Sequence, residues 1–151
     1  MSATYVLGQA DFFDAGSGTA ANRMYVPLGL AIDTAANRLY VSEVMNNRVV
    51  VFDFDAGITN GMSASWVLGQ IDFVSRVDAG GVGQLNQPGG LAVDSARGRL
   101  FAADVGNHRV QVWDTSNLTN GAVPVNVMGQ RALTTTTASA TQAGLQMPIG
   151  L

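Results

Sequence analysis

Short apolar runs that close on a charged residue alternate along this chain with short polar turns. GLAID at 29–33 is followed by the turn TAAN, the run RLYVSE at 38–43, the turn VMNN and the run RVVVFD at 48–53. Apolar runs of this length, bounded by Asn, Asp and Gly, are typical of β-strands. Continuous runs such as VVVF are typical of strands that are covered on both faces. No window has a convincing apolar period of 3.6 residues, so we expect very little helix.

This pattern occurs twice in full and begins a third time. VLGQADF, which starts at residue 6, returns as VLGQIDF from residue 67 and as VMGQRAL from residue 127. PLGLAID at 27–33 returns as PGGLAVD at 88–94, and PIGL at 148–151 begins another copy. Repeats of four short strands, without a helix in each unit, predict an all-β fold built from β-propeller blades of four antiparallel strands each.

The connections between the repeated units have equal lengths and unrelated contents. Between each GQ pair and the next proline lie 17 residues, at 10–26, 71–87 and 131–147. We therefore expect a single propeller segment over residues 1–151 with two complete blades. Its predicted parts are 1–26, the outer strand of a preceding blade plus a long loop; 27–70, blade 1; 71–87, a long loop; 88–130, blade 2; and 131–151, a long loop and the start of a third blade.

Two blades cannot close a propeller ring, which needs roughly four to eight. An isolated pair would expose the apolar faces at its two ends, and soluble monomers rarely tolerate so large an apolar patch. The ring is therefore expected to be completed either by oligomerisation or by further blades of a longer chain.

The second unit carries a specific resemblance. Pro-x-Gly-Leu-Ala-Val-Asp, Arg-Leu-Phe-x-x-Asp and Asn-His-Arg-Val-x-Val-Trp-Asp follow one another over residues 88–114. This order resembles the NHL repeat, named after Asn-His-Leu, although Arg109-Val110 replaces the leucine and the unit is longer than is usual. The resemblance implies about six blades, which three copies of two blades would supply, so we expect self-association, with a homotrimer favoured. It also implies an alternative function, because six-bladed relatives include metal-dependent lyases and lactonases with a site in the central channel.

The second turn of each unit raises the question of a site, because it holds the only histidine. Glu43, Asn46 and Arg48 of the first copy match an acid, an Asn and an Arg of the second, whereas the histidine is matched by Asn47. A set that recurs in both blades is interpreted as turn chemistry, in which the acid accepts amides and pairs with the arginine. A metal or acid–base role for one imidazole without partner ligands is the less favoured alternative. The candidate structural turn residues are Glu43, Asn46, Arg48, Asp104, Asn107, His108 and Arg109.

Recognition is expected where the copies differ. In a propeller of this topology the long connections and the second turns lie at one end of the blades, and loops on a rigid scaffold are the usual place for binding. Recurrent residues such as Phe12 and Phe73 are expected to plug the loop base, and the glutamine of each GQ pair to hold loop backbone. The candidate recognition-loop residues are Asp11, Phe13, Asp14, Asp72, Arg76 and Asp78.

Composition removes several classes of function. The net charge is −3 and all eight cations are arginines, so no basic surface for nucleic acid is expected, although RNA binding is known among NHL proteins. The absence of cysteine excludes disulfides and thiolate ligands, and no apolar run is long enough for a membrane span. We predict no catalytic residue, metal or cofactor, and the compartment is left open. The expected function is a non-catalytic scaffold for protein or ligand interaction and for self-assembly, with a protein partner at the loop face.

Overall fold

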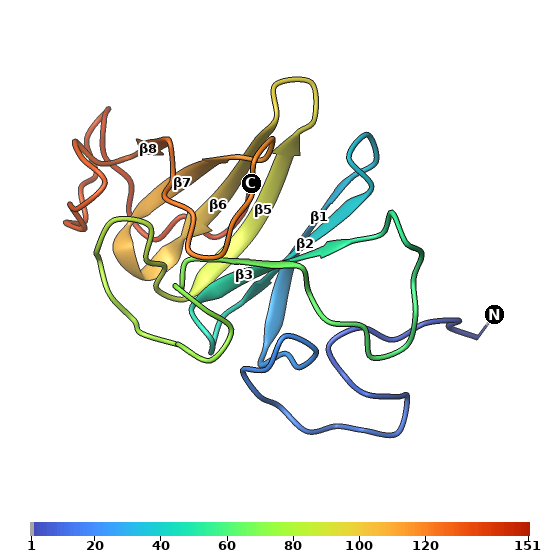
Figure 1. The fold of residues 1–151 in the computed structure, drawn as a ribbon. Helices are drawn as coiled ribbons and strands as arrows, with labels where there is room; N and C mark the ends of the chain where they lie inside the picture. Colours follow the sequence, from blue (N-terminus) through green and yellow to red (C-terminus); the bar gives the residue numbers. More distant parts are fainter. Residues whose placement is uncertain (1) are drawn as a thin grey trace.

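Each repeat folds into one four-stranded antiparallel sheet whose strands follow the chain order. The computed structural model describes residues 2–151, and the two sheets fan apart from a shared edge (Figure 1). Blade 1 contains β1 (Pro27–Asp33), β2 (Arg38–Glu43), β3 (Arg48–Asp53) and β4 (Trp66–Leu68), and blade 2 contains β5 (Pro88–Asp94), β6 (Arg99–Asp104), β7 (Arg109–Asp114) and β8 (Asn126–Met128). The predicted all-β blades are confirmed.

Helix is confined to one short element. In the described part of the chain it is η1 (Val105–Asn107), a 3₁₀ turn between β6 and β7. Blade 1 makes the corresponding connection with a simple turn, since VMNN stands there in place of VGNH. Among residues 2–151, no helix has the length and apolarity needed to cross a membrane.

The turn between the first two strands of a blade is closed by the aspartate that ends the inner strand. The Asp33 carboxylate accepts the N–H groups of Ala35 and Ala36, both at 3.0 Å. In blade 2, Asp94 accepts the N–H of Arg97 at 3.1 Å. Both carboxylates therefore act as local turn acceptors at the end of the inner strand.

The two blades meet where β1 and β5 lie side by side. A Cβ on Gly29 would lie 2.3 Å from the carbonyl oxygen of Gly89, so only glycine allows this approach. Ser42 links the strands, because its hydroxyl accepts the N–H of Gly29 at 2.8 Å and donates to the Gly89 carbonyl at 2.7 Å. The Pro-x-Gly-Leu motif thus fixes the spacing between adjacent blades.

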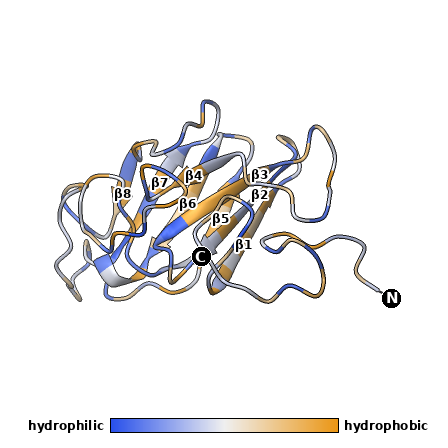
Figure 2. Cartoon of the chain, turned by 60° about the horizontal axis from the view of Figure 1, so that its bottom comes forward, coloured by the Kyte–Doolittle hydropathy of each residue, from blue (hydrophilic) through white to orange (hydrophobic). Residues whose placement is uncertain are grey.

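Opposite faces of the two sheets form the main core. We call the face that a blade turns toward the next blade its C-side face, and the opposite one its N-side face. The C-side face of blade 1 packs on the N-side face of blade 2, and the apolar colour of the strands follows this contact (Figure 2). The buried cluster contains Tyr40, Val49, Val51 and Leu68 of blade 1, Leu91, Leu100, Ala102 and Trp113 of blade 2, and the loop residues Leu85 and Leu118.

The two flanking segments differ from the strand expectation. Neither 2–26 nor 148–151 forms an assigned strand, although the former was expected to include an outer strand and the latter to begin an inner one. Ile149 nevertheless accepts the N–H of Gly90 at 2.6 Å. A strand needs a ladder, and residues 2–151 hold no sheet from a neighbouring blade with which either segment could pair.

Candidate functional site

A buried ion pair organises the loop end of blade 1. Arg48 begins β3 opposite Glu43 at the end of β2, and both side chains are fully buried with Nε and Oε1 at 2.6 Å. The remaining guanidinium donors reach four loop carbonyls, which belong to Thr19 at 2.5 Å, Phe73 at 2.6 Å, Arg23 at 3.0 Å and Ala20 at 3.3 Å. One arginine therefore fastens both the preceding long loop and the following one.

Blade 2 repeats this arrangement. Arg109 and Asp104 are fully buried, with Nε and Oδ2 at 2.6 Å. The guanidinium donates to the carbonyls of Gln84 at 2.9 Å and Gly81 at 3.3 Å in one loop, and to that of Leu133 in the next. The 71–87 loop presents carbonyls to both arginines, from Phe73 to Arg48 and from Gly81 and Gln84 to Arg109, which constrains its length.

The conserved asparagine of each second turn completes the clamp. The side-chain nitrogen of Asn46 donates to Glu43 at 2.6 Å and to the Gly18 carbonyl at 2.8 Å. Asn107 donates likewise to Asp104 at 3.0 Å and to the Ala79 carbonyl at 3.0 Å. Burial raises the pKa of the Glu43 carboxyl, and the Arg48 guanidinium opposes that rise.

The only histidine and its counterpart in blade 1 make the same contact. Asn47 and His108 both adopt the left-handed conformation, with φ of 50° and 56°. The side-chain oxygen of Asn47 accepts the N–H of Gln87 at 2.9 Å, and Nδ1 of His108 accepts that of Met147 at 3.2 Å. Each side chain therefore ties its turn to the residue just before the inner strand of the next repeat.

In the second and third GQ pairs, the glutamine holds the first half of the long loop that follows it. Gln70 donates to the carbonyls of Asn47 at 2.9 Å and Val77 at 2.8 Å, and it accepts the N–H of Val77 at 3.0 Å. Gln130 donates to the carbonyl of His108 at 3.1 Å. These contacts are those expected for an amide that supports loop backbone.

Gln111 belongs to the clamp of blade 2 and was not singled out from the sequence. It is fully buried, and its amide donates to the Gln84 carbonyl at 2.6 Å and to Asp104 at 2.8 Å. Blade 1 has Val50 at the same register position, next to the longer acid Glu43. Two differences between the copies could have identified Gln111 from the sequence. Blade 2 has this polar residue where blade 1 has an apolar one, and it has the shorter acid Asp104 where blade 1 has Glu43.

The candidate recognition residues fall into two groups. Asp11 and Asp72 each accept two backbone amides of a tight turn, at 2.7–3.0 Å, and so shape their loops. Asp14 accepts the N–H of Gly16 at 2.8 Å and pairs with Arg23 at 2.8 Å, and these two contacts lower its pKa.

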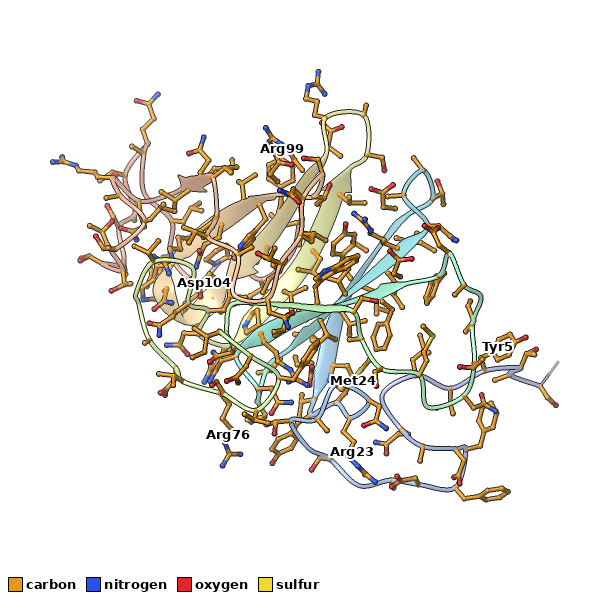
Figure 3. The ribbon with its side chains drawn as sticks, in the orientation of Figure 1. Tyr5, Arg23, Met24, Arg76, Arg99 and Asp104 are labelled. Atoms are coloured by element: carbon orange, nitrogen blue, oxygen red, sulfur yellow. The ribbon has the colours of Figure 1, made fainter. Side chains whose placement is uncertain are left out.

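The other group is displayed to solvent. Phe13 is 97% exposed, and Arg76 and Asp78 are also exposed. Figure 3 shows the Arg76 side chain pointing away from the molecule, whereas Asp104 lies between its sheet and the 71–87 loop. The structure therefore separates loop-shaping aspartates from side chains that are exposed to solvent.

Among the described residues, no three His, Asp or Glu side chains gather into a possible metal site. The buried carboxylates of Glu43 and Asp104 are occupied by arginine, amide and backbone donors. This arrangement supports loop geometry.

The family comparison matches the unit that contains the histidine. Residues 85–113 match the model of the NHL repeat, from the loop residue Leu85 to Trp113 near the end of β7. The second blade is similar to an NHL repeat. The matched range covers β5, β6, the second turn and β7 up to Trp113, so Asp104, Asn107 and Arg109 lie inside the matched repeat.

Curated relatives are NHL proteins as well. NHL repeat-containing protein 2 of Bos taurus is 28% identical over 103 residues, which cover 68% of this chain and 14% of the relative. NHL repeat-containing protein 2 of Homo sapiens is 25% identical over 99 residues, which cover 66% and 13%. The chain thus spans about one seventh of the length of these relatives. Among solved structures, a luciferin-regenerating enzyme aligns with a TM-score of 0.46 and 18% identity, over 70% of this chain and 30% of its own.

Proposed function

We propose that this chain is a non-catalytic propeller scaffold that self-associates through the outer faces of its two blades. The observation that carries the proposal is the unequal burial of equivalent residues. Leu91, on the N-side face of blade 2, is 7% exposed, whereas Leu30, at the same register position of blade 1, is 65% exposed. Leu68 on the C-side face of blade 1 is fully buried, whereas the equivalent Met128 of blade 2 is 52% exposed.

The occupant that fits each exposed face is a second copy of the chain. The C-side face of blade 1 already packs on the N-side face of blade 2 within one molecule. The C-side face of blade 2 therefore offers the counterpart of a surface that binds an N-side face. Blade 1 of another copy presents such a face, which is exposed along β1 and covered farther out by Leu7, Met24 and Phe73 of its own chain. This contact is heterologous, so it closes into a ring or continues as a filament. Three copies would give the about six blades of a common propeller size.

The energetics favour covering these faces. Burying one leucine-sized side chain is worth about 1.5–3 kcal/mol. Leu28 and Ile32 are each 60% exposed beside Leu30, so β1 presents three exposed apolar side chains. The charge of the chain is small and no lysine lies in the sequence, so electrostatic repulsion between copies is weak.

The test is a charge placed on the free face. Leu30→Asp is expected to give a folded monomer, because Leu30 is 65% exposed within one chain and lies on the face that we propose another copy covers. Sedimentation velocity with far-UV circular dichroism measures both properties. Ala35→Asp adds the same charge in an exposed turn away from this face and should assemble like the wild type, whereas Leu91→Asp should fail to fold. A Leu30→Asp chain that assembles like the wild type would overturn the proposal.

The loop end is the part of the scaffold that we assign to a protein partner. Phe13 and Val74 stand at equivalent turn positions, and they are 97% and 71% exposed. Phe73, by contrast, packs on the core of blade 1, and its ring lies 5.9 Å from the Arg48 guanidinium carbon. Phe13→Ser and Val74→Ser should therefore leave the midpoint of urea unfolding unchanged, and Phe73→Ser should lower it. Equal destabilisation by all three would show that the tips are structural and would remove them from the recognition surface.

A further inference from the structure

A short segment before the first blade lies on blade 1 as an outer strand of a preceding blade would. The N–H of Val6 donates to the side-chain oxygen of Asn60 at 2.9 Å, and the carbonyl of Val6 accepts the N–H of Gly61 at 3.1 Å. Val67 of β4 makes the same pair of bonds with Asn120 at 3.1 Å and Gly121 at 3.0 Å. We call residues 6–9 the VLGQ segment, and its contact with blade 1 copies the contact of β4 with blade 2.

The packing of residues 7 and 8 also matches that of residues 68 and 69. Leu7 packs against the buried cluster on the N-side face of blade 1, as Leu68 does in the core between the blades. Gly8 has φ of 79° and Gly69 has φ of 87°. A Cβ on either glycine would lie 2.5 Å from a covering side chain, Met24 in the first case and Leu85 in the second. Residues 6–8 therefore share the backbone bonds, the apolar contact and the glycine conformation of the outer-strand motif.

The third copy of this motif belongs to β8, and its outer edge is free. Gly129 has φ of 83°, and a Cβ there would lie 2.4 Å from Leu145, so the motif is folded in the same way. The N–H of Val127, which corresponds to that of Val6 and Val67, donates at 2.8 Å to the side chain of its own neighbour Asn126. The equivalent valines, Val6 and Val67, bind an Asn-Gly pair instead.

We infer that the VLGQ segment and β8 of a second copy compete for one site on blade 1, formed by Asn60, Gly61 and the N-side face. The inference rests on the self-association proposed above and adds the identity of the contact. The site takes an extended segment with an apolar residue and a glycine of positive φ after the bonded valine. Because the VLGQ segment is tethered, it competes at a high effective concentration and weakens assembly. Self-association then requires its release from blade 1.

The experiment compares the full chain with a variant that lacks residues 2–9. Sedimentation equilibrium is expected to show association strengthened about tenfold or more in the truncated chain, in line with removal of a tethered competitor. A labelled peptide of residues 2–12 should bind the truncated chain in fluorescence polarisation and reverse the gain. The matched control peptide with Val6→Pro lacks the N–H that meets Asn60 and should not bind. Asn60→Ala in the truncated chain should weaken peptide binding, whereas Asn120→Ala, at the equivalent internal contact, should not abolish it.

The outcomes separate this inference from the self-association itself. Unchanged or weaker association after truncation, or peptide binding that is indifferent to Val6→Pro, would overturn the competition. If neither chain associates but the peptide binds the truncated chain specifically, the site exists and only self-association is refuted. Should truncation prevent folding, Gly8→Val in the full chain tests the same point, because a side chain there meets Met24 and dislodges the segment. That variant must also associate more tightly than the wild type.

Discussion

His108 and Asn47 show how one structural task is carried out by two residue types. Each holds a left-handed turn and accepts the amide that precedes an inner strand. His108→Asn should therefore change the free energy of unfolding by less than about 0.5 kcal/mol. His108→Ala leaves the Met147 amide without this acceptor and should cost about 0.5–1.5 kcal/mol. Urea unfolding of both variants checks this, and equal losses would show that the contact contributes nothing specific.

Val26 is the strained member of a repeated position. It has φ of 54°, and the equivalent Gln87 and Met147 have φ of 51° and 45°. A β-branched residue is especially unfavourable in the left-handed region, whereas asparagine adopts it readily. Val26→Asn should therefore stabilise the chain by about 1 kcal/mol. The control Gln87→Asn should gain less in the same thermal unfolding assay, and a destabilised Val26→Asn chain would contradict the strain argument.

Arg109 should be among the most sensitive residues of the molecule. Its removal leaves the Asp104 carboxylate fully buried without its cation, and it frees three loop carbonyls. Loss of one partner of a buried pair costs about 3–5 kcal/mol. Arg97, which pairs with Asp94 at the surface with 80% of its side chain exposed, is the matched control. Arg109→Ala should lower the unfolding midpoint strongly and Arg97→Ala hardly at all; similar effects would exclude the clamp.

At the scale of elements, the repeat made most of the fold predictable. The same strand residues, turn residues and loop ends occur in both copies. An assignment made in one copy can therefore be checked against the other. The outer strands were harder, because β4 and β8 have only three residues each and pair on one edge. Whether residues 6–9 count as a strand depends on a neighbouring sheet, which no local pattern encodes.

The candidate site was predictable to a similar degree. The acid, asparagine and arginine of each second turn were identified because they recur at fixed spacing. Their targets were not, since the arginines bind loop carbonyls, and a carbonyl is available at any residue type. Gln111 was missed because its role exists in one copy only. Contacts that depend on backbone atoms or on a single copy leave no repeated signal in the sequence.

The aspartates in the tight turns determine how the stability of the fold changes with acid. Hydrogen bonds lower the pKa of Asp72, chiefly from Ser75, and that of Asp94, chiefly from Arg97. A carboxyl with a lowered folded pKa stabilises the fold above its unfolded pKa of about 3.9, and the gain is lost as the pH falls through the folded value. Glu43, whose pKa burial raises, acts in the opposite direction.

Thermal unfolding should therefore show a midpoint that falls as the pH is lowered below about 4, where these aspartates become protonated. Asp72→Ala removes one of the carboxylates and should make that fall shallower while lowering the midpoint at neutral pH. A midpoint that stays level through acidification, or a steeper fall in the variant, would contradict the assignment of these turns.

For the whole molecule, the central proposal is that two blades, with one buried interface between them and exposed apolar residues on their outer sides, associate with copies of themselves. The clearest evidence for it is the comparison of Leu91 with Leu30, because the same position is buried in blade 2 and exposed in blade 1. The decisive measurement is the mass of the purified wild-type chain in solution, by light scattering coupled to size-exclusion chromatography. We predict three times the chain mass of 15.7 kDa at micromolar concentration. A folded, stable species with the mass of one chain would contradict the account.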